Sequence, residues 1–129
     1  MVFVAQINLI VADLERSRDF YERLGMTFRA RSRHASGPAE AWVSTSPGVT
    51  LVLHSTEFAS WWDASSPQPS AGGPQLDVEL ESRESLDAAA AALNTGGTIV
   101  KKPTDMPWGQ RFAIVLDPDG HRVGLKAPR

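Results

Sequence analysis

The sequence predicts an α+β fold in which two βαβββ modules in tandem form a curled mixed sheet around a cavity. Each half of the chain runs from an apolar strand into a capped helix and then into further strands. The pattern restarts after a stretch rich in proline, glycine and serine. We therefore expect modules at 1–64 and 75–129, joined by a linker at 65–74 within one structural domain.

The first module begins with a strand at 2–11, which is rich in β-branched and apolar residues. Asp13 can cap the helix that follows, and Gly25 supplies its left-handed end. Further strands are expected at 26–33, 40–45 and 49–54, with a turn at 46–48 before the last one.

The second module repeats this order. Residues 75–80 alternate apolar and polar side chains as a strand does. Ser82 can cap a helix whose apolar side chains recur at helical spacing until Gly96 and Gly97. Strands follow at about 98–101, 111–117 and 121–126.

Positions in the two modules correspond. Counting back seven residues from the two caps leads to Gln6 and Gln75, each in the first strand of its module. Counting forward four residues from the turn glycines Gly48 and Gly120 leads to Val52 and Gly124, each in the last strand. Such internal repetition indicates two equivalent structural units.

Composition excludes several classes of protein. The formal net charge is -2, with 13 basic and 15 acidic residues, which gives no electrostatic basis for binding nucleic acid or an anionic membrane. The absence of cysteine excludes disulfides and thiolate chemistry. We find neither a membrane span nor a signal peptide and expect a cytoplasmic protein.

Two segments, "DLERSRDFYERLGM" and "WGQRFAIVLDPDGHRVGL", resemble the signature segments of the vicinal oxygen chelate superfamily. This superfamily includes glyoxalase I, bleomycin resistance proteins and extradiol dioxygenases. In its metal-dependent members, the ligands come from the middle of the first and last strands of each module. By this resemblance, the ligand positions here are Gln6, Val52, Gln75 and Gly124.

Valine and glycine have no side-chain donor, and two neutral amides hold a divalent ion weakly. We therefore expect no metal and no cofactor. If a metal site exists, its candidates are Gln6, Gln75 and His54, because His54 shares a face with Val52. A displaced oxygen-rich site could use Asp77 and Glu79, which could instead form ion pairs with Arg122 and Lys126.

Gly124 predicts a roomy pocket, and a β-bulge is the structural alternative.

The chain contains four tryptophans, which favour a flat or hydrophobic ligand. We expect a metal-independent protein that resembles bleomycin resistance proteins and sequesters a planar or aromatic small molecule, an antibiotic included, at a homodimer interface. The alternatives are a metal-dependent lyase, isomerase or dioxygenase, and a metal-free enzyme that uses Asp77 or Glu79. The expected ligand-binding residues are Gln6, Trp42, Val52, His54, Trp61, Trp62, Gln75, Asp77, Trp108, Arg111, Arg122 and Gly124.

Overall fold

Two units make up the chain in the computed structural model, Met1–Pro69 and Ser70–Arg129, and each is considered by itself. The structure describes residues 1–65 and 68–129. The expected linker at 65–74 includes residues 66 and 67, which lie outside the described residues. Across the described ranges, no helix has both the length and the apolar character needed to cross a membrane.

The elements follow the order β1 (Gln6–Val11), α1 (Leu14–Leu24), β2 (Phe28–Arg31), β3 (Ala41–Ser44), β4 (Thr50–Ser55), α2 (Thr56–Trp62), β5 (Leu76–Glu79), α3 (Arg83–Leu93), β6 (Thr98–Asp105), β7 (Gln110–Leu116) and β8 (Arg122–Pro128).

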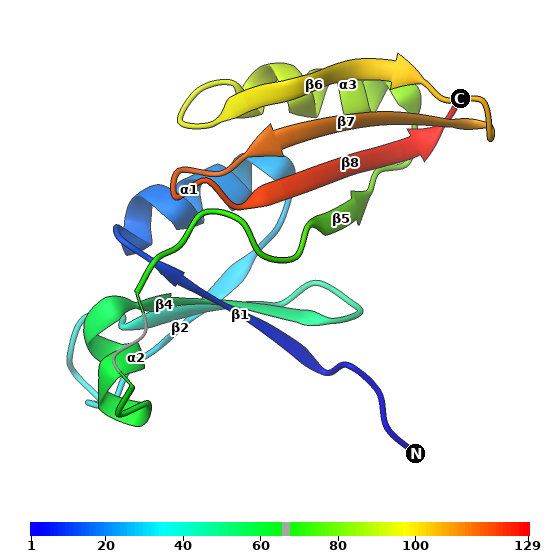
Figure 1. Cartoon of the computed structure of the whole chain (residues 1–129). Coiled ribbons are helices and arrows are strands. Elements are labelled where there is room, and N and C mark those ends of the chain that lie inside the picture. Colours follow the sequence, from blue (N-terminus) through cyan, green and yellow to red (C-terminus); the bar gives the residue numbers. More distant parts are fainter. Residues whose placement is uncertain (66–67) are drawn as a thin grey trace. The chain divides into compact units, whose positions relative to one another are not determined.

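The first unit contains a four-stranded mixed sheet in the order β1-β4-β3-β2 (Figure 1). The β1 strand pairs with β4 in parallel, whereas the other pairs are antiparallel. Helix α1 begins at Asp13, whose carboxylate accepts a hydrogen bond from the Arg16 backbone amide at 3.0 Å, and ends at Gly25 with φ 112°. Its buried Phe20, Tyr21 and Leu24 cover one face of the sheet. Such side chains each contribute about 1.5–3 kcal/mol when buried.

A short helix, α2, lies in a segment for which the sequence prediction gives no element. Ser55 ends β4 and caps α2, since its hydroxyl accepts a hydrogen bond from the Phe58 backbone amide at 3.1 Å. The chain therefore turns back directly from β4, and Phe58 packs against Ala41, Val43 and Val52. This cluster lies on the face of the sheet opposite α1.

The second unit contains the corresponding mixed sheet in the order β5-β8-β7-β6, with β5 and β8 parallel (Figure 1). Ser82 and Ser85 form a reciprocal capping box at the start of α3. Buried Leu86, Ala89, Ala90 and Leu93 of α3 pack on the sheet.

The prediction of an α+β fold with two βαβββ modules, each with a four-stranded mixed sheet, is confirmed. Three strands differ in length from the prediction by four residues: β1 begins at Gln6 rather than at residue 2, β2 covers Phe28–Arg31 rather than 26–33, and β6 continues to Asp105 rather than ending at residue 101. Pro103 is tolerated inside this strand because β6 is at the edge of its sheet and its register with β7 is irregular there.

Candidate functional site

Three polar side chains meet on the face of the first sheet that is opposite α1. Gln6 and Asn8 are two residues apart on β1 and therefore point to the same face. His54 of β4 is in register with Ile10, which shares that face. The register between β1 and β4 thus places Gln6 and His54 on one face.

The carboxamide of Asn8 joins these side chains. Its Oδ1 atom is 2.7 Å from the donating Nε2 of Gln6 and 2.8 Å from Nε2 of His54. Because an amide oxygen only accepts hydrogen bonds, the imidazole carries its proton on Nε2. The Nδ1 atom of His54 then bears a lone pair.

This lone pair is buried without a hydrogen-bond partner among the described residues. His54 is only 4% exposed. Burial and, secondarily, the positive charge of Arg31 lower the pKa of His54 below its ordinary value of 6.5. At neutral pH His54 is thus an uncharged acceptor.

Aromatic rings from α2 pack against this imidazole. The Phe58 ring stacks on it with a centroid distance of 5.8 Å, and the Trp62 ring meets it edge-on at 5.2 Å. Phe58 and Trp62 are four residues apart and so lie on one helical face. The capped start of α2 at the end of β4 therefore brings aromatic and polar groups together.

A pocket of about 250 Å³ opens at this position. Its lining consists of Gln6, Asn8, Arg31, His54, Phe58 and Trp62. Arg31 reaches it from β2, because Arg31 pairs with Ala41 and Ala41 pairs with His54 across the sheet. The pocket combines neutral acceptors, aromatic walls and one cation, which suits a small planar molecule.

Trp61 lies beside the pocket lining without belonging to it. Its ring stacks on Phe58 at 5.8 Å, and the guanidinium of Arg33 lies 5.0 Å from the Trp61 ring. Arg33 also donates hydrogen bonds to the carboxylate of Glu40, which lower the pKa of Glu40 to about 2. Trp61 is 62% exposed and Trp62 is 45% exposed.

Two predicted site residues of the first module lie away from the pocket. Val52 is fully buried in the apolar cluster beneath Phe58. Trp42 lies on the face covered by α1, where the guanidinium of Arg18 is 4.5 Å from its ring. The sequence shows that Trp42 is in a strand, but not which face of the sheet it occupies.

In the second module, the expectation of open space at Gly124 is wrong. A Cβ atom at this position would be 2.8 Å from Nε2 of Gln75, 3.1 Å from Cζ of Phe112 and even closer to Oδ1 of Asp77. The β-bulge is wrong as well, because Gly124 pairs in regular register with Asp77 and Ile114. Neighbouring side chains therefore fill the place that a side chain at Gly124 would take.

Other predicted site residues on the same face as Gly124 form polar contacts with neighbouring side chains. Nε2 of Gln75 donates to Asp77 at 2.9 Å, and Arg122 donates to Oε1 of Gln75 at 3.4 Å. Lys126 is 4.0 Å from the Asp77 carboxylate, which is one of the ion pairs that the sequence suggests. Glu79 lines a separate pocket of about 450 Å³ together with Leu80, Glu81, Gly109, Gln110, Ala127 and Pro128.

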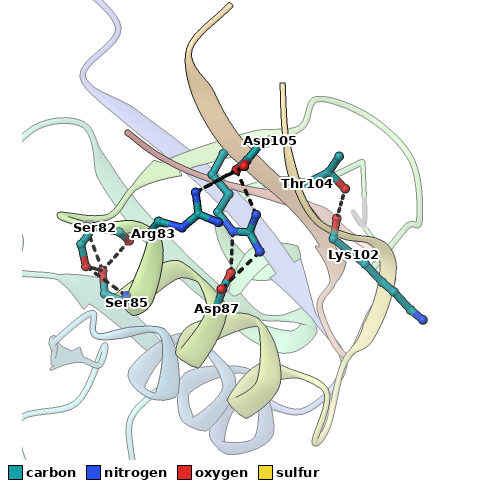
Figure 2. A network of polar contacts seen from close by, with 8 residues as sticks. Ser82, Arg83, Ser85, Asp87, Lys102, Thr104 and Asp105 are labelled. Atoms are coloured by element: carbon teal, nitrogen blue, oxygen red, sulfur yellow. Dashed lines mark hydrogen bonds and ion pairs between the residues drawn. The ribbon is translucent and has the colours of Figure 1, made fainter. Parts of the chain in front are cut away.

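Arg111 and Trp108 do not join this polar group. Arg111 lies toward α3, where it donates to Asp87 at 2.7 Å and to Asp105 at 3.0 Å. Figure 2 shows Asp87 and Asp105 in this network, which also includes Arg83. Trp108 lies in the turn between β6 and β7 and is 66% exposed.

The residues at the expected metal positions do not fit a divalent cation. In the first module, Gln6 is held through its amide nitrogen by Asn8, and Val52 offers no donor. In the second, Gln75 is bound on both its nitrogen and its oxygen, and Gly124 offers no donor. Two neutral amides supply neither the charge nor the ligand number that such an ion needs.

Asp117, Asp119 and His121 form a compact group of possible metal-ligand atoms. The carboxylate of Asp117, however, already forms hydrogen bonds within the turn. Its Oδ1 accepts from the backbone amides of Asp119 and His121, and its Oδ2 is 2.9 Å from Nδ1 of His121. These contacts raise the pKa of His121, with the hydrogen bond to Asp117 as the main cause. The group therefore stabilises the turn before β8.

The sequence prediction does not include Asn8, Arg31 and Phe58. Asn8 follows Gln6 by two residues in an alternating strand, and a serine precedes the segment with Phe58 at cap spacing, so both signals are present in the sequence. Arg31 depends on the register of three strands, which the sequence alone does not fix.

Curated relatives match part of the chain. The chain is 31% identical over 81 residues to the uncharacterized protein Mb0911c of Mycobacterium bovis, covering 63% of this chain and 53% of that protein. The match spans about half the length of the curated relatives.

Two solved structures are similar to the whole chain. A glyoxalase-related enzyme from Fulvimarina pelagi has a TM-score of 0.82 at 22% identity, covering 98% of this chain and 88% of that one. TnmS3, an antibiotic binding protein from Streptomyces sp. CB03234, has a TM-score of 0.64 at 28% identity, covering 100% and 98%. The family model of the glyoxalase, bleomycin resistance protein and dioxygenase superfamily matches residues 4–125, and the chain belongs to that superfamily.

Proposed function

We propose that this protein is a metal-independent binding protein that sequesters a planar or aromatic small molecule, with an antibiotic among the candidates. The observation that carries the proposal is the pocket of the first module. It places the half-exposed Trp62 and the buried Phe58 next to the unpaired acceptor of His54. Aromatic walls with few polar groups are typical of sites for flat ligands.

The state of the metal positions supports binding without a metal. In each module, the two positions that the resemblance assigns to ligands offer one neutral amide between them, and that amide already has a hydrogen-bond partner. The likeness to TnmS3, an antibiotic binding protein, supports the same class of function.

The proposal includes a homodimer, in keeping with the bleomycin resistance branch that the sequence resembles. The β1 strand is at the edge of its sheet, and the apolar residues Val2, Phe3 and Val4 before it are exposed. Such a surface favours association with a second copy. Light scattering is expected to give twice the mass of the chain, and a monomer at micromolar concentration would remove this part of the proposal.

The binding function is tested with 1-anilinonaphthalene-8-sulfonate, a planar aromatic anion. It is expected to quench tryptophan fluorescence at micromolar concentrations, and Trp62→Phe is expected to remove most of that quenching. Trp108→Phe is the matched control, because Trp108 is an exposed tryptophan of the other module. Equal loss in both variants, or no quenching in the natural protein, contradicts the proposal.

A further inference from the structure

We infer that the pocket of the first module selects a planar aromatic ligand with a hydroxyl group, which donates a hydrogen bond to Nδ1 of His54. This inference rests on the proposed function, because it specifies the ligand of the same pocket. The starting observation is a buried acceptor that has no hydrogen-bond partner within the described part of the chain, on a side chain that lines a cavity. Buried polar atoms almost always have a partner, so an exception needs an explanation.

The chemistry of this acceptor is set by Asn8. Its Oδ1 accepts from Nε2 of His54, so the proton stays on Nε2 and the lone pair stays on Nδ1. The amide of Gln6 donates to the same oxygen and thereby fixes its orientation. The Nδ1 atom can therefore accept a hydrogen bond from a donor on a ligand.

The charge around the pocket decides which kind of donor fits. Among the described residues that line the pocket, Arg31 is the one with a permanent charge, and none of them is a carboxylate. A ligand with an ammonium group would be repelled by the positive charge of Arg31. A phenolic or enolic hydroxyl is neutral, donates one hydrogen bond and gains from a nearby cation if it acquires negative charge.

The packing of the imidazole explains why the ligand is planar. Water does not reach Nδ1, and the rings on the imidazole are those of Phe58 and Trp62. Phe58 is only 7% exposed and is held by the apolar cluster, whereas Trp62 is 45% exposed at the last position of α2. The indole of Trp62 is therefore the ring that a ligand displaces, and a flat aromatic ring replaces its contact with His54.

The test compares two probes, 2-naphthol and 2-methoxynaphthalene, by isothermal titration calorimetry. They share the ring system, but only 2-naphthol has a hydroxyl proton. One neutral hydrogen bond to a buried acceptor predicts that 2-naphthol binds about tenfold more tightly. His54→Phe keeps an aromatic ring and is expected to reduce 2-naphthol binding to the level of 2-methoxynaphthalene, whose affinity stays the same.

A second variant changes the protonation of Nδ1 without removing the imidazole ring of His54. Asn8→Asp places a carboxylate against Nε2, which raises the pKa of His54, so that Nδ1 carries a proton at a pH below this raised pKa. The preference for 2-naphthol is then expected to disappear below that pH and to return above it. His34→Gln is the control, because His34 is exposed and lies outside the pocket lining. Circular dichroism verifies that each variant is folded.

The outcomes separate this inference from the proposed function. Equal affinity of the natural protein for both probes overturns the hydroxyl preference and leaves an aromatic binding protein. A tenfold preference that survives both His54→Phe and Asn8→Asp overturns the role of Nδ1. If neither probe nor 1-anilinonaphthalene-8-sulfonate binds, the inference and the proposed function both fail.

Discussion

The crowding around Gly124 gives a prediction that can be worked out from distances. In Gly124→Ala, the new Cβ meets Nε2 of Gln75 at 2.8 Å and Cζ of Phe112 at 3.1 Å, and it lies closer still to Oδ1 of Asp77. Overpacking of this kind costs about 1–3 kcal/mol. Replacing glycine within a strand gains about 0.5–1 kcal/mol. Because the nearest atoms are the ends of flexible side chains, we expect a net loss of about 1 kcal/mol.

The partner variant is Asp77→Ala, which removes the nearest obstacle. The ion pair of Asp77 with Lys126 spans 4.0 Å and is partly exposed, so its loss alone costs about 0–1 kcal/mol. In this background, Gly124→Ala is expected to be neutral or stabilising. The double-mutant cycle therefore gives a coupling of about 1 kcal/mol between the two positions.

Urea unfolding followed by circular dichroism measures this cycle. In thermal unfolding, the melting temperature of the single variant Gly124→Ala is expected to fall by about 4 °C. If Gly124→Ala stabilises the natural protein, or changes stability equally in both backgrounds, the space above Gly124 is open. The account of this glycine as a site of close approach would then be incorrect.

Three further predictions concern packing and pH. Phe58→Ala is expected to lower the unfolding free energy by about 3–5 kcal/mol in urea titrations, because Phe58 fills the cluster between α2 and the sheet; a loss below about 1 kcal/mol contradicts that packing. The raised pKa of His121 means that its pair with Asp117 stabilises the fold below pH 6.5 and is lost as pH rises through the folded pKa. The stability difference between the natural protein and His121→Gln should shrink accordingly, and a pH-independent difference speaks against the pair. Glu40 has a lowered pKa, so its contribution is present above pH 4.5 and is lost as pH falls through about 2; acid titration of Glu40→Gln should lack this part of the transition.

Much of the architecture could be predicted from local sequence. Asp13 and Ser82 are helix caps in the structure, as their positions before apolar helical patterns predict. The correspondence between the modules also agrees with the structure, since the first and last strands pair in parallel in both. These features depend on neighbouring residues and on turn chemistry.

The candidate site could be predicted only in part. Alternation places His54 on the face of Val52, but the register of β1 and β4 brings Gln6 to that face. The role of Asn8 depends on side-chain hydrogen bonds with Gln6 on its own strand and with His54 on β4. Trp42 and Arg111 lie on the faces covered by helices, where they pair with Arg18 and with Asp87. Strand register and helix placement decide these contacts, and neither can be predicted from the local sequence pattern.

The position of Gly124 shows a different limit. Its correspondence with Val52 indicates an inward-facing site without a side-chain donor, but it does not show what fills the space. In the structure, Asp77 and Gln75 fill it from the adjacent strand. A missing side chain in a sequence is thus compatible both with a cavity and with a close approach.

The central claim is that the pocket of the first module binds a planar aromatic molecule. Titration with 2-naphthol, followed by the amide and indole signals in ¹H–¹⁵N NMR spectra, tests it most directly. We predict that the shifts concentrate on Asn8, His54 and Phe58 and on the indole of Trp62, while the indole of Trp108 is unaffected. Shifts that concentrate in the second module, or no shifts at saturating 2-naphthol, would contradict the account.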